Sequence, residues 1–209
     1  MMIGAVNLLV VSGLSPVDAD PWQAWLETRF PQATWVRPLD GDWPDLDRWG
    51  ERIDQALAGG GGRPWLALAH GFGALALVRH AFNSAHGLSG AMLVAPADPA
   101  RFGHDLASLG HALPVPASVI ALQGGAHDAS PWLQDVPARD WAAAWGARLV
   151  DAGVGPTLPP SPWAEGEALL AHHLQSLDAT PRVLSAGAPA AQDAYASAHR
   201  FVGVPRRAP

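Results

Sequence analysis

The stretch most suggestive of chemistry is Ala69-His70-Gly71-Phe72-Gly73, which joins an apolar run to a helical pattern. Small residues alternate along it. In nucleophilic enzymes such spacing permits a strained strand-to-helix turn, a nucleophile elbow, that lifts its central side chain toward the ligand. Here Ala69 replaces the usual first glycine, and the centre is Gly71, which has no side chain. The sequence therefore predicts the elbow without its nucleophile.

Serines in the predicted loops are the first alternative source of a nucleophile. Ser12 and Ser15 follow the first apolar run, and Ser130 lies in a later loop. Each could replace the missing side chain, but serines are common in loops and turns for local backbone reasons. We therefore favour the interpretation of all three as ordinary loop residues.

Histidines near the same predicted edge could supply a base or hold a metal ion. His70 precedes the elbow centre and could act as a replacement base, although we favour a structural role. His127 and Asp128 could form a displaced base with its orienting carboxylate, although we favour a loop histidine beside an unused aspartate. The three together could bind zinc or iron, but their spacing does not support a metal site.

Composition excludes several other classes of chemistry. All 13 cationic residues are arginine, so no lysine can act as a base, form a Schiff base or complete a phosphate-binding loop. Cysteine is absent, which excludes thiol nucleophiles, disulfides and iron–sulfur clusters. The net charge of −6 comes without any basic block, so we expect no nucleic-acid partner.

Apolar patterning indicates how these residues are positioned. Short buried runs predict strands at 3–11, 33–38, 64–70, 89–95, 117–122 and 147–151. Helical spacing predicts helices at 21–30, 45–58, 73–85, 138–145 and 163–177. The alternation predicts an α/β fold with a doubly wound sheet of about six mainly parallel strands and helices on both faces. In such sheets ligands bind beyond the carboxyl ends of the strands.

The predicted domain spans residues 1–177, and 178–209 form an Ala- and Pro-rich C-terminal extension, either a strap or a tail. The first apolar run predicts a strand rather than a signal peptide, since it has no positive n-region. No apolar run reaches the roughly 18–20 residues of a membrane span. We therefore expect a cytoplasmic protein with no membrane partner.

Several further motifs occur in the order of one known family. They are PWQAWL at 21–26, DW at 42–43, DLDRW at 45–49, LVAPAD at 93–98, WGARLVDAG at 145–153 and PWAEG at 162–166. With the elbow stretch, the chain resembles the small serine hydrolases of the retinoblastoma-binding-protein-9 and YdeN type over about residues 6–177. The resemblance implies a compact α/β-hydrolase fold without a lid domain and without a cofactor.

The resemblance also implies where a Ser-Asp-His triad would stand. Gly71 occupies the serine position, Asp128 the aspartate position and Pro156 the histidine position. A hydroxyl nucleophile needs a base within hydrogen-bond reach. Glycine supplies no hydroxyl, and proline supplies no base. The implied protein is a serine hydrolase relative without its nucleophile and its base.

Backbone groups could still bind a ligand at this place. The amides of Leu14 and Phe72 are expected to form a pair resembling an oxyanion hole, at the start of a helix. We count Gly13, His70 and His127 with them as candidate ligand-binding residues. The expected ligand is a small apolar or weakly anionic molecule, or a partner protein. Two alternatives stay open: an esterase with a relocated nucleophile, and a scaffold that docks through residues 178–209.

Overall fold

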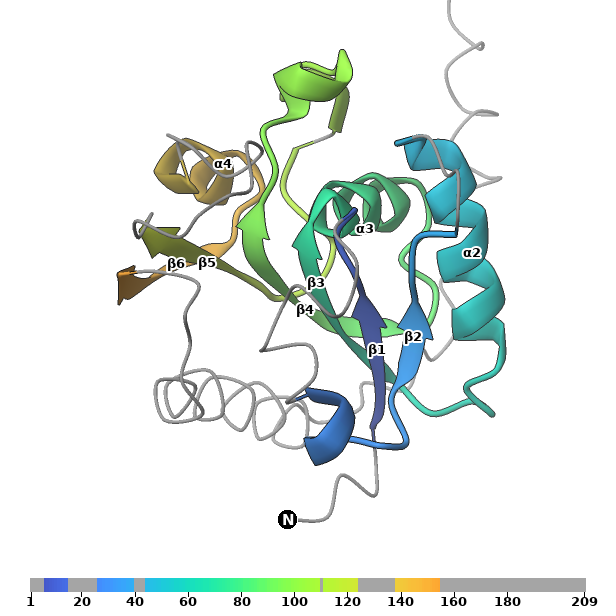
Figure 1. Ribbon diagram of the computed structural model, residues 1–209. Helices are drawn as coiled ribbons and strands as arrows, with labels where there is room; N and C mark the ends of the chain where they lie inside the picture. The colour runs from blue at the N-terminus through green and yellow to red at the C-terminus, as the bar shows by residue number, and fades with distance from the viewer. Residues whose placement is uncertain (1–5, 15–25, 40–43, 110, 124–137, 155–209) are drawn as a thin grey trace, which may run out of the picture. The chain divides into compact units, whose positions relative to one another are not determined.

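A computed structural model describes residues 6–14, 26–39, 44–109, 111–123 and 138–154 of the chain. They form a six-stranded sheet in the order β2-β1-β3-β4-β5-β6 (Figure 1). The strands are β1 (Asn7–Val11), β2 (Thr34–Val36), β3 (Trp65–Gly71), β4 (Leu88–Pro96), β5 (Ala117–Gln123) and β6 (Arg148–Val154). Every neighbouring pair is parallel, which confirms the predicted fold class.

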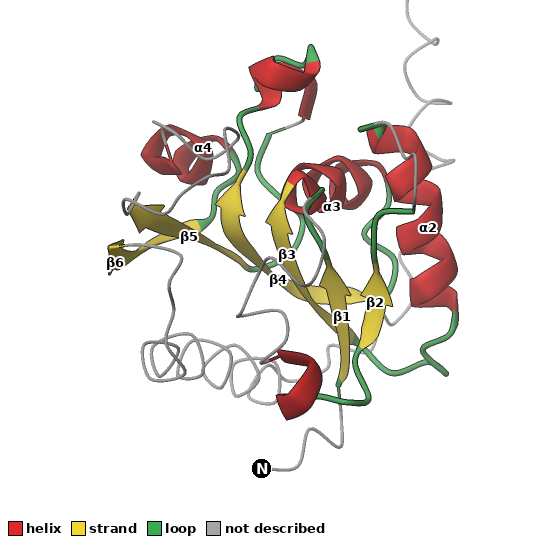
Figure 2. Ribbon diagram, in the orientation of Figure 1, coloured by secondary structure: helices red, strands yellow, loops and turns green. Residues whose placement is uncertain are grey.

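Helices connect the strands (Figure 2). They are α2 (Leu46–Ala58), α3 (Phe72–Asn83) and α4 (Ala138–Ala144), with short 3₁₀ helices η2 (Pro99–Phe102) and η3 (Ala107–Leu109). Residues 26–29 are also helical, within the helix predicted at 21–30. The two 3₁₀ helices were not predicted. The helix expected at 163–177 and the extension at 178–209 lie outside the described residues, so both stay predictions.

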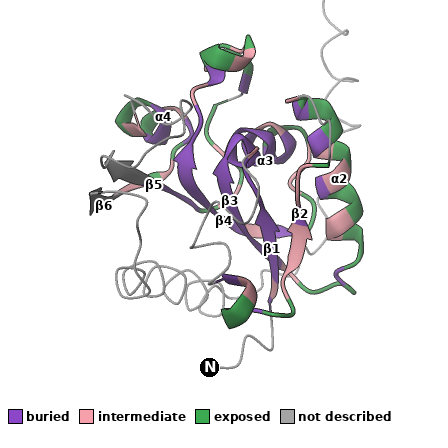
Figure 3. Cartoon of the chain, in the orientation of Figure 1, coloured by how far each residue is buried: buried purple, intermediate pink, exposed green. Residues whose placement is uncertain are grey.

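The central strands β1, β3 and β4 are almost entirely buried (Figure 3), and their successive side chains point to opposite faces of the sheet. On β3, Ala67 and Ala69 face one cluster of buried residues, and Leu66 and Leu68 face another. The first cluster contains the apolar sides of α2, α3 and α4, and the second contains Leu26 and Phe30. The described helices therefore lie on both faces of the sheet, as predicted.

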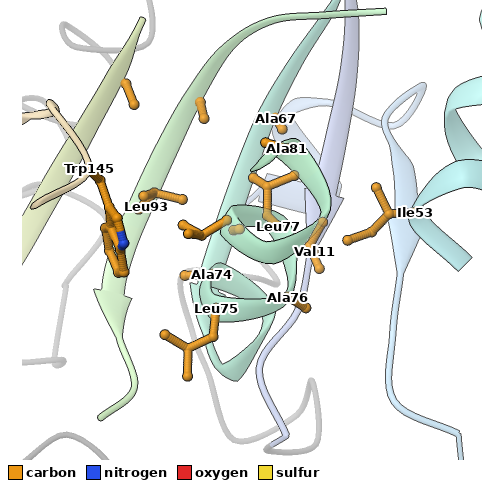
Figure 4. Close-up of a cluster of buried hydrophobic side chains, with 14 of the residues drawn as sticks. Val11, Ile53, Ala67, Ala74, Leu75, Ala76, Leu77, Ala81, Leu93 and Trp145 are labelled. Atoms are coloured by element: carbon orange, nitrogen blue, oxygen red, sulfur yellow. The ribbon is translucent and has the colours of Figure 1, made fainter. Parts of the chain in front are cut away.

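Small side chains let α3 pack close to the sheet. Ala74, Ala76 and Ala81 of α3 are buried against the first cluster, together with Leu75 and Leu77. Figure 4 shows these side chains between the strands and α2, with Trp145 nearby. This close packing fixes the position of α3, whose first residue, Phe72, directly follows Gly71 at the centre of the predicted elbow.

Asp45, the residue before α2, caps the start of the helix. The carboxylate of Asp45 accepts hydrogen bonds from the backbone N–H groups of Asp47, at 2.9 Å, and Arg48, at 3.1 Å. An aspartate at this position satisfies donors that have no partner inside the helix. Behind this cap, Trp49 and Ile53 form the buried side of the helix.

Two hydrogen bonds fasten the end of α2 to the sheet. Asn7 Nδ2 donates to the Gly60 carbonyl at 2.8 Å, and Trp65 Nε1 donates to the Leu57 carbonyl at 3.0 Å. A Cβ added at Gly60 would lie 2.3 Å from Trp65 Nε1 and 3.0 Å from Asn7 Nδ2. Any larger residue at this position would push the tryptophan away from its acceptor.

We therefore expect Gly60→Ala to lower the free energy of unfolding by about 1–3 kcal/mol, the usual cost of overpacking. Urea unfolding at neutral pH measures this change. Gly59→Ala is the matched control, because among the described residues its added Cβ would meet only the Ala56 carbonyl, at 3.4 Å. Equal losses in the two variants would contradict the steric explanation.

Candidate functional site

The candidate site lies where the strand order changes direction. From β1 the chain continues to β2 on one side, whereas β3 leads to β4 on the other side. The carboxyl ends of β1 and β3 are therefore neighbours at the switch point, the usual ligand position in open α/β sheets. Ser12 and Gly13 follow β1 at this edge, and Gly71 ends β3.

Gly71 adopts the backbone conformation of a strained turn. Its dihedral angles are φ +55° and ψ −122°, a region that costs a non-glycine residue about 1–3 kcal/mol. A Cβ built on Gly71 would lie 3.8 Å from Gly13 Cα, its nearest neighbour among the described residues, which is an ordinary contact distance. The elbow geometry is present, and the described residues leave space for a side chain that the sequence does not supply.

The peptide after Gly71 is oriented by β4. The Ala97 N–H donates to the Gly71 carbonyl at 3.0 Å. Because the carbonyl and the following N–H of a trans peptide point in opposite directions, the Phe72 N–H points away from β4. This amide opens the first turn of α3, which has no side-chain cap and no acidic residue. An amide at the start of a helix can donate to a carbonyl or carboxylate group.

A bulge in β4 makes this contact possible. His70 pairs with Val94, but Gly71 pairs with Pro96, so Ala95 is an extra residue in the ladder. Ala95 has a φ of +38°, unusual for a residue with a Cβ. The bulge advances β4 so that the Ala97 N–H reaches the elbow. Sequence reasoning missed this role, and the only signal was a run of small residues around Pro96.

Gly73 lets α3 begin close to the loop after β1. A Cβ on Gly73 would lie 2.2 Å from the Ser12 carbonyl oxygen and 2.7 Å from that of Val11. Both distances are far below van der Waals contact, and both atoms belong to the backbone. Gly73, the last small residue of the predicted elbow stretch, therefore has a steric role.

His70 lies beneath the turn. Its side chain is buried, at 7% exposure. A Cβ on Gly13 would lie 3.1 Å from His70 Nδ1, so the ring packs against the loop that carries Leu14. This position supports the interpretation of His70 as a packing residue that supports the site.

Ser12 is fully buried, with 0% exposure, and its hydroxyl makes no hydrogen bond within the described part of the chain. A substrate could not reach this oxygen without displacing the loop, which argues against Ser12 as a relocated nucleophile.

Phe72 contributes only its backbone to the site, because its side chain is in the core. The ring packs edge-on to Trp49, with centroids 5.5 Å apart and an interplanar angle of 82°. It also contacts Phe102 of η2, at 4.8 Å between centroids. This aromatic contact joins the elbow to both α2 and η2.

The remaining predicted site residues are not placed. Asp128, His127 and Pro156 lie outside the described residues, as do Ser15 and Ser130. Their roles stay predictions.

Among the described residues, no group of three or more His, Asp or Glu side chains could hold a metal ion. In that same part of the chain, no helix is long and apolar enough to cross a membrane.

A parallel sheet with a strand-elbow-helix junction at its switch point defines an α/β-hydrolase-like protein. More specifically, the chain belongs to the serine hydrolase family, whose model matches residues 8–158. No curated protein matches the chain.

Solved structures support this assignment. A YdeN-like hydrolase from Pectobacterium atrosepticum is 32% identical, with a TM-score of 0.71, over 82% of this chain and 92% of that one. A hydrolase of the α/β superfamily from Xanthomonas campestris is 19% identical, with a TM-score of 0.53, over 81% of this chain and 98% of that one. Est1E from Butyrivibrio proteoclasticus, solved with ferulic acid, is 13% identical, with a TM-score of 0.59, over 82% and 90%. The last two matches show the fold alone.

Proposed function

We propose that this chain is a catalytically degenerate member of the serine hydrolase family, which binds a small ligand or a partner protein at the elbow without cleaving it. One observation carries the proposal: the elbow keeps its strained conformation at Gly71, although glycine supplies no nucleophile. Glycine adopts this positive φ without strain, so the turn is held by its contacts and needs no side chain. These contacts are the Ala97 hydrogen bond and the close approach at Gly73.

The ligand we propose is small and apolar or weakly anionic. The Phe72 N–H opens the uncapped first turn of α3, where the helix dipole favours negative charge. Leu14 follows Gly13, whose Cα adjoins the space above Gly71, so its amide is the second proposed donor. Pro156, at the position where the resemblance implies the base, supports binding without turnover.

Fluorophosphonate labelling tests the missing nucleophile. The probe forms a covalent bond with an activated serine, which requires a hydroxyl, a base and an oxyanion hole together. We expect no adduct in the intact mass of the purified protein after a reaction that fully labels an active serine hydrolase in the same tube. Circular dichroism establishes that the unlabelled protein is folded. A stoichiometric adduct, mapped by peptide analysis to one serine, would instead establish an active hydrolase with a relocated nucleophile.

A further inference from the structure

A buried histidine lies at the contact between α2 and α3, remote from the elbow along α3. His80, in the last turn of α3, is only 5% exposed. Its Nδ1 atom lies 3.7 Å from Asp54 Oδ1 on α2. Its Nε2 atom is buried and makes no hydrogen bond within the described part of the chain. If the ring were protonated, Asp54 would be its acidic neighbour on the Nδ1 side. Its Nε2–H would have no hydrogen-bond acceptor among the described residues.

In the described part of the chain, the charged groups near this ring come from α2 and α3. The elements packed against α3 are α2, β1, β3, β4 and η3. The strands and η3 contain no Asp, Glu or Arg, and their single histidine, His70, lies at the opposite end of the interface, beside Gly13. The charged residues of α2 are Asp47, Arg48, Glu51, Arg52 and Asp54. Among the described residues, Asp54 approaches His80, at 3.7 Å, whereas Asp47 lies 3.8 Å from Arg79 Nε, the charged neighbour of His80 on α3.

Protonation of His80 disfavours the folded state. Burial lowers the pKa of His80 below its ordinary value of 6.5, and the Asp54 carboxylate opposes this effect only in part. The folded chain therefore binds this proton more weakly than the unfolded chain does. The contribution of His80 to stability is complete above pH 6.5 and is lost as the pH falls below that value. An unpartnered, buried N–H adds to the cost of the charged form.

The same interface reaches the elbow. At its other end, Trp49 of α2 packs against Phe72, the residue that follows Gly71. Of the two helices, α2 is the less firmly held: it buries three residues, whereas α3 buries nine. An opening that hydrates His80 would therefore displace α2 and withdraw Trp49 from Phe72.

We infer that buried His80 forms a pH-sensitive latch, which holds α2 against α3 at neutral pH and releases it in mildly acidic solution, while Asp54 opposes the release. This inference concerns the α2–α3 contact and holds whether or not the elbow binds a ligand. Local opening of this kind is a normal property of outer helices that bury few side chains.

Hydrogen exchange read by mass spectrometry tests the latch in the full chain. Protection factors, corrected for the intrinsic pH dependence of exchange, are compared at pH 7.5 and pH 5.5, on the order of one unit either side of the ordinary histidine pKa. We expect protection across α2 to fall several-fold at the lower pH, while protection in β3 and β4 changes less. In His80→Gln this acid-dependent fall should disappear.

Two further variants separate the latch from general acid sensitivity. His111→Gln is the matched control, because His111 is exposed and should leave the wild-type fall unchanged. Asp54→Asn removes the carboxylate that favours protonated His80, so the fall should become deeper. Asp54 is 65% exposed, so this variant should fold even if His80→Gln does not. An unchanged fall in either His80→Gln or Asp54→Asn would overturn the inference.

Discussion

Gly73→Ala should lower the free energy of unfolding by about 3 kcal/mol or more, the upper range for overpacking, because its Cβ would overlap two backbone oxygens. These atoms, the carbonyl oxygens of Ser12 and Val11, lie 2.2 and 2.7 Å from the added atom. Neither can rotate away as a side chain does. The start of α3 must therefore move away from β1, and the elbow must move with it.

The expected change in the free energy of unfolding has the opposite sign to that of most Gly→Ala replacements in helices. At an exposed helix position, replacement of glycine by alanine is stabilising by up to about 1 kcal/mol. Gly50→Ala in α2 is the matched control, since its Cβ would have no neighbour within 4 Å. Guanidinium unfolding should show opposite signs for the two variants. Stabilisation by Gly73→Ala would mean that α3 does not approach the loop after β1 as described.

The second large effect is a gain of activity in Gly71→Ser combined with Pro156→His. The elbow can accept the serine, because a Cβ on Gly71 would meet Gly13 Cα at 3.8 Å. The expected cost is the strain of the positive φ, about 1–3 kcal/mol. General-base catalysis contributes typically 10²–10⁴-fold, so the double variant should react with a fluorophosphonate about that much faster than Gly71→Ser alone.

Labelling rates of the wild type, both single variants and the double variant measure this gain. Pro156→His alone is the control and should stay unlabelled, because the elbow would still have no hydroxyl. If Gly71→Ser reacts as fast as the double variant, a base other than position 156 serves the site. That result would contradict the proposed loss of the base.

The sequence was sufficient to predict the fold, because short apolar runs alternate with helical patterns. The run at 64–70 predicted a strand, and the WLALAHG segment of β3 is buried throughout. The elbow was predictable from the same stretch, since alternate small residues reflect steric demands such as the one measured at Gly73.

The support behind the elbow was not predictable from local sequence. Ala95 becomes a bulge only because Gly71 pairs with Pro96, and this register depends on two strands that are separate in the chain. Likewise, the pairing of His80 with Asp54 depends on how α2 crosses α3. Patterns of apolar residues specify which elements form, whereas these contacts depend on their exact alignment.

The edge strand β2 affects whether copies of the molecule aggregate. It has three residues, and no strand pairs with its outer side within the described part of the chain, so that side could pair with a strand of another chain. So short a strand offers few backbone groups to such a template, and Pro38, two residues beyond it, has no N–H to donate. The Arg37 guanidinium lies over the Trp35 ring, 4.6 Å from its centroid, and brings a charge to this border. In a chain that is 49% hydrophobic, these features discourage the growth of intermolecular sheets from this side.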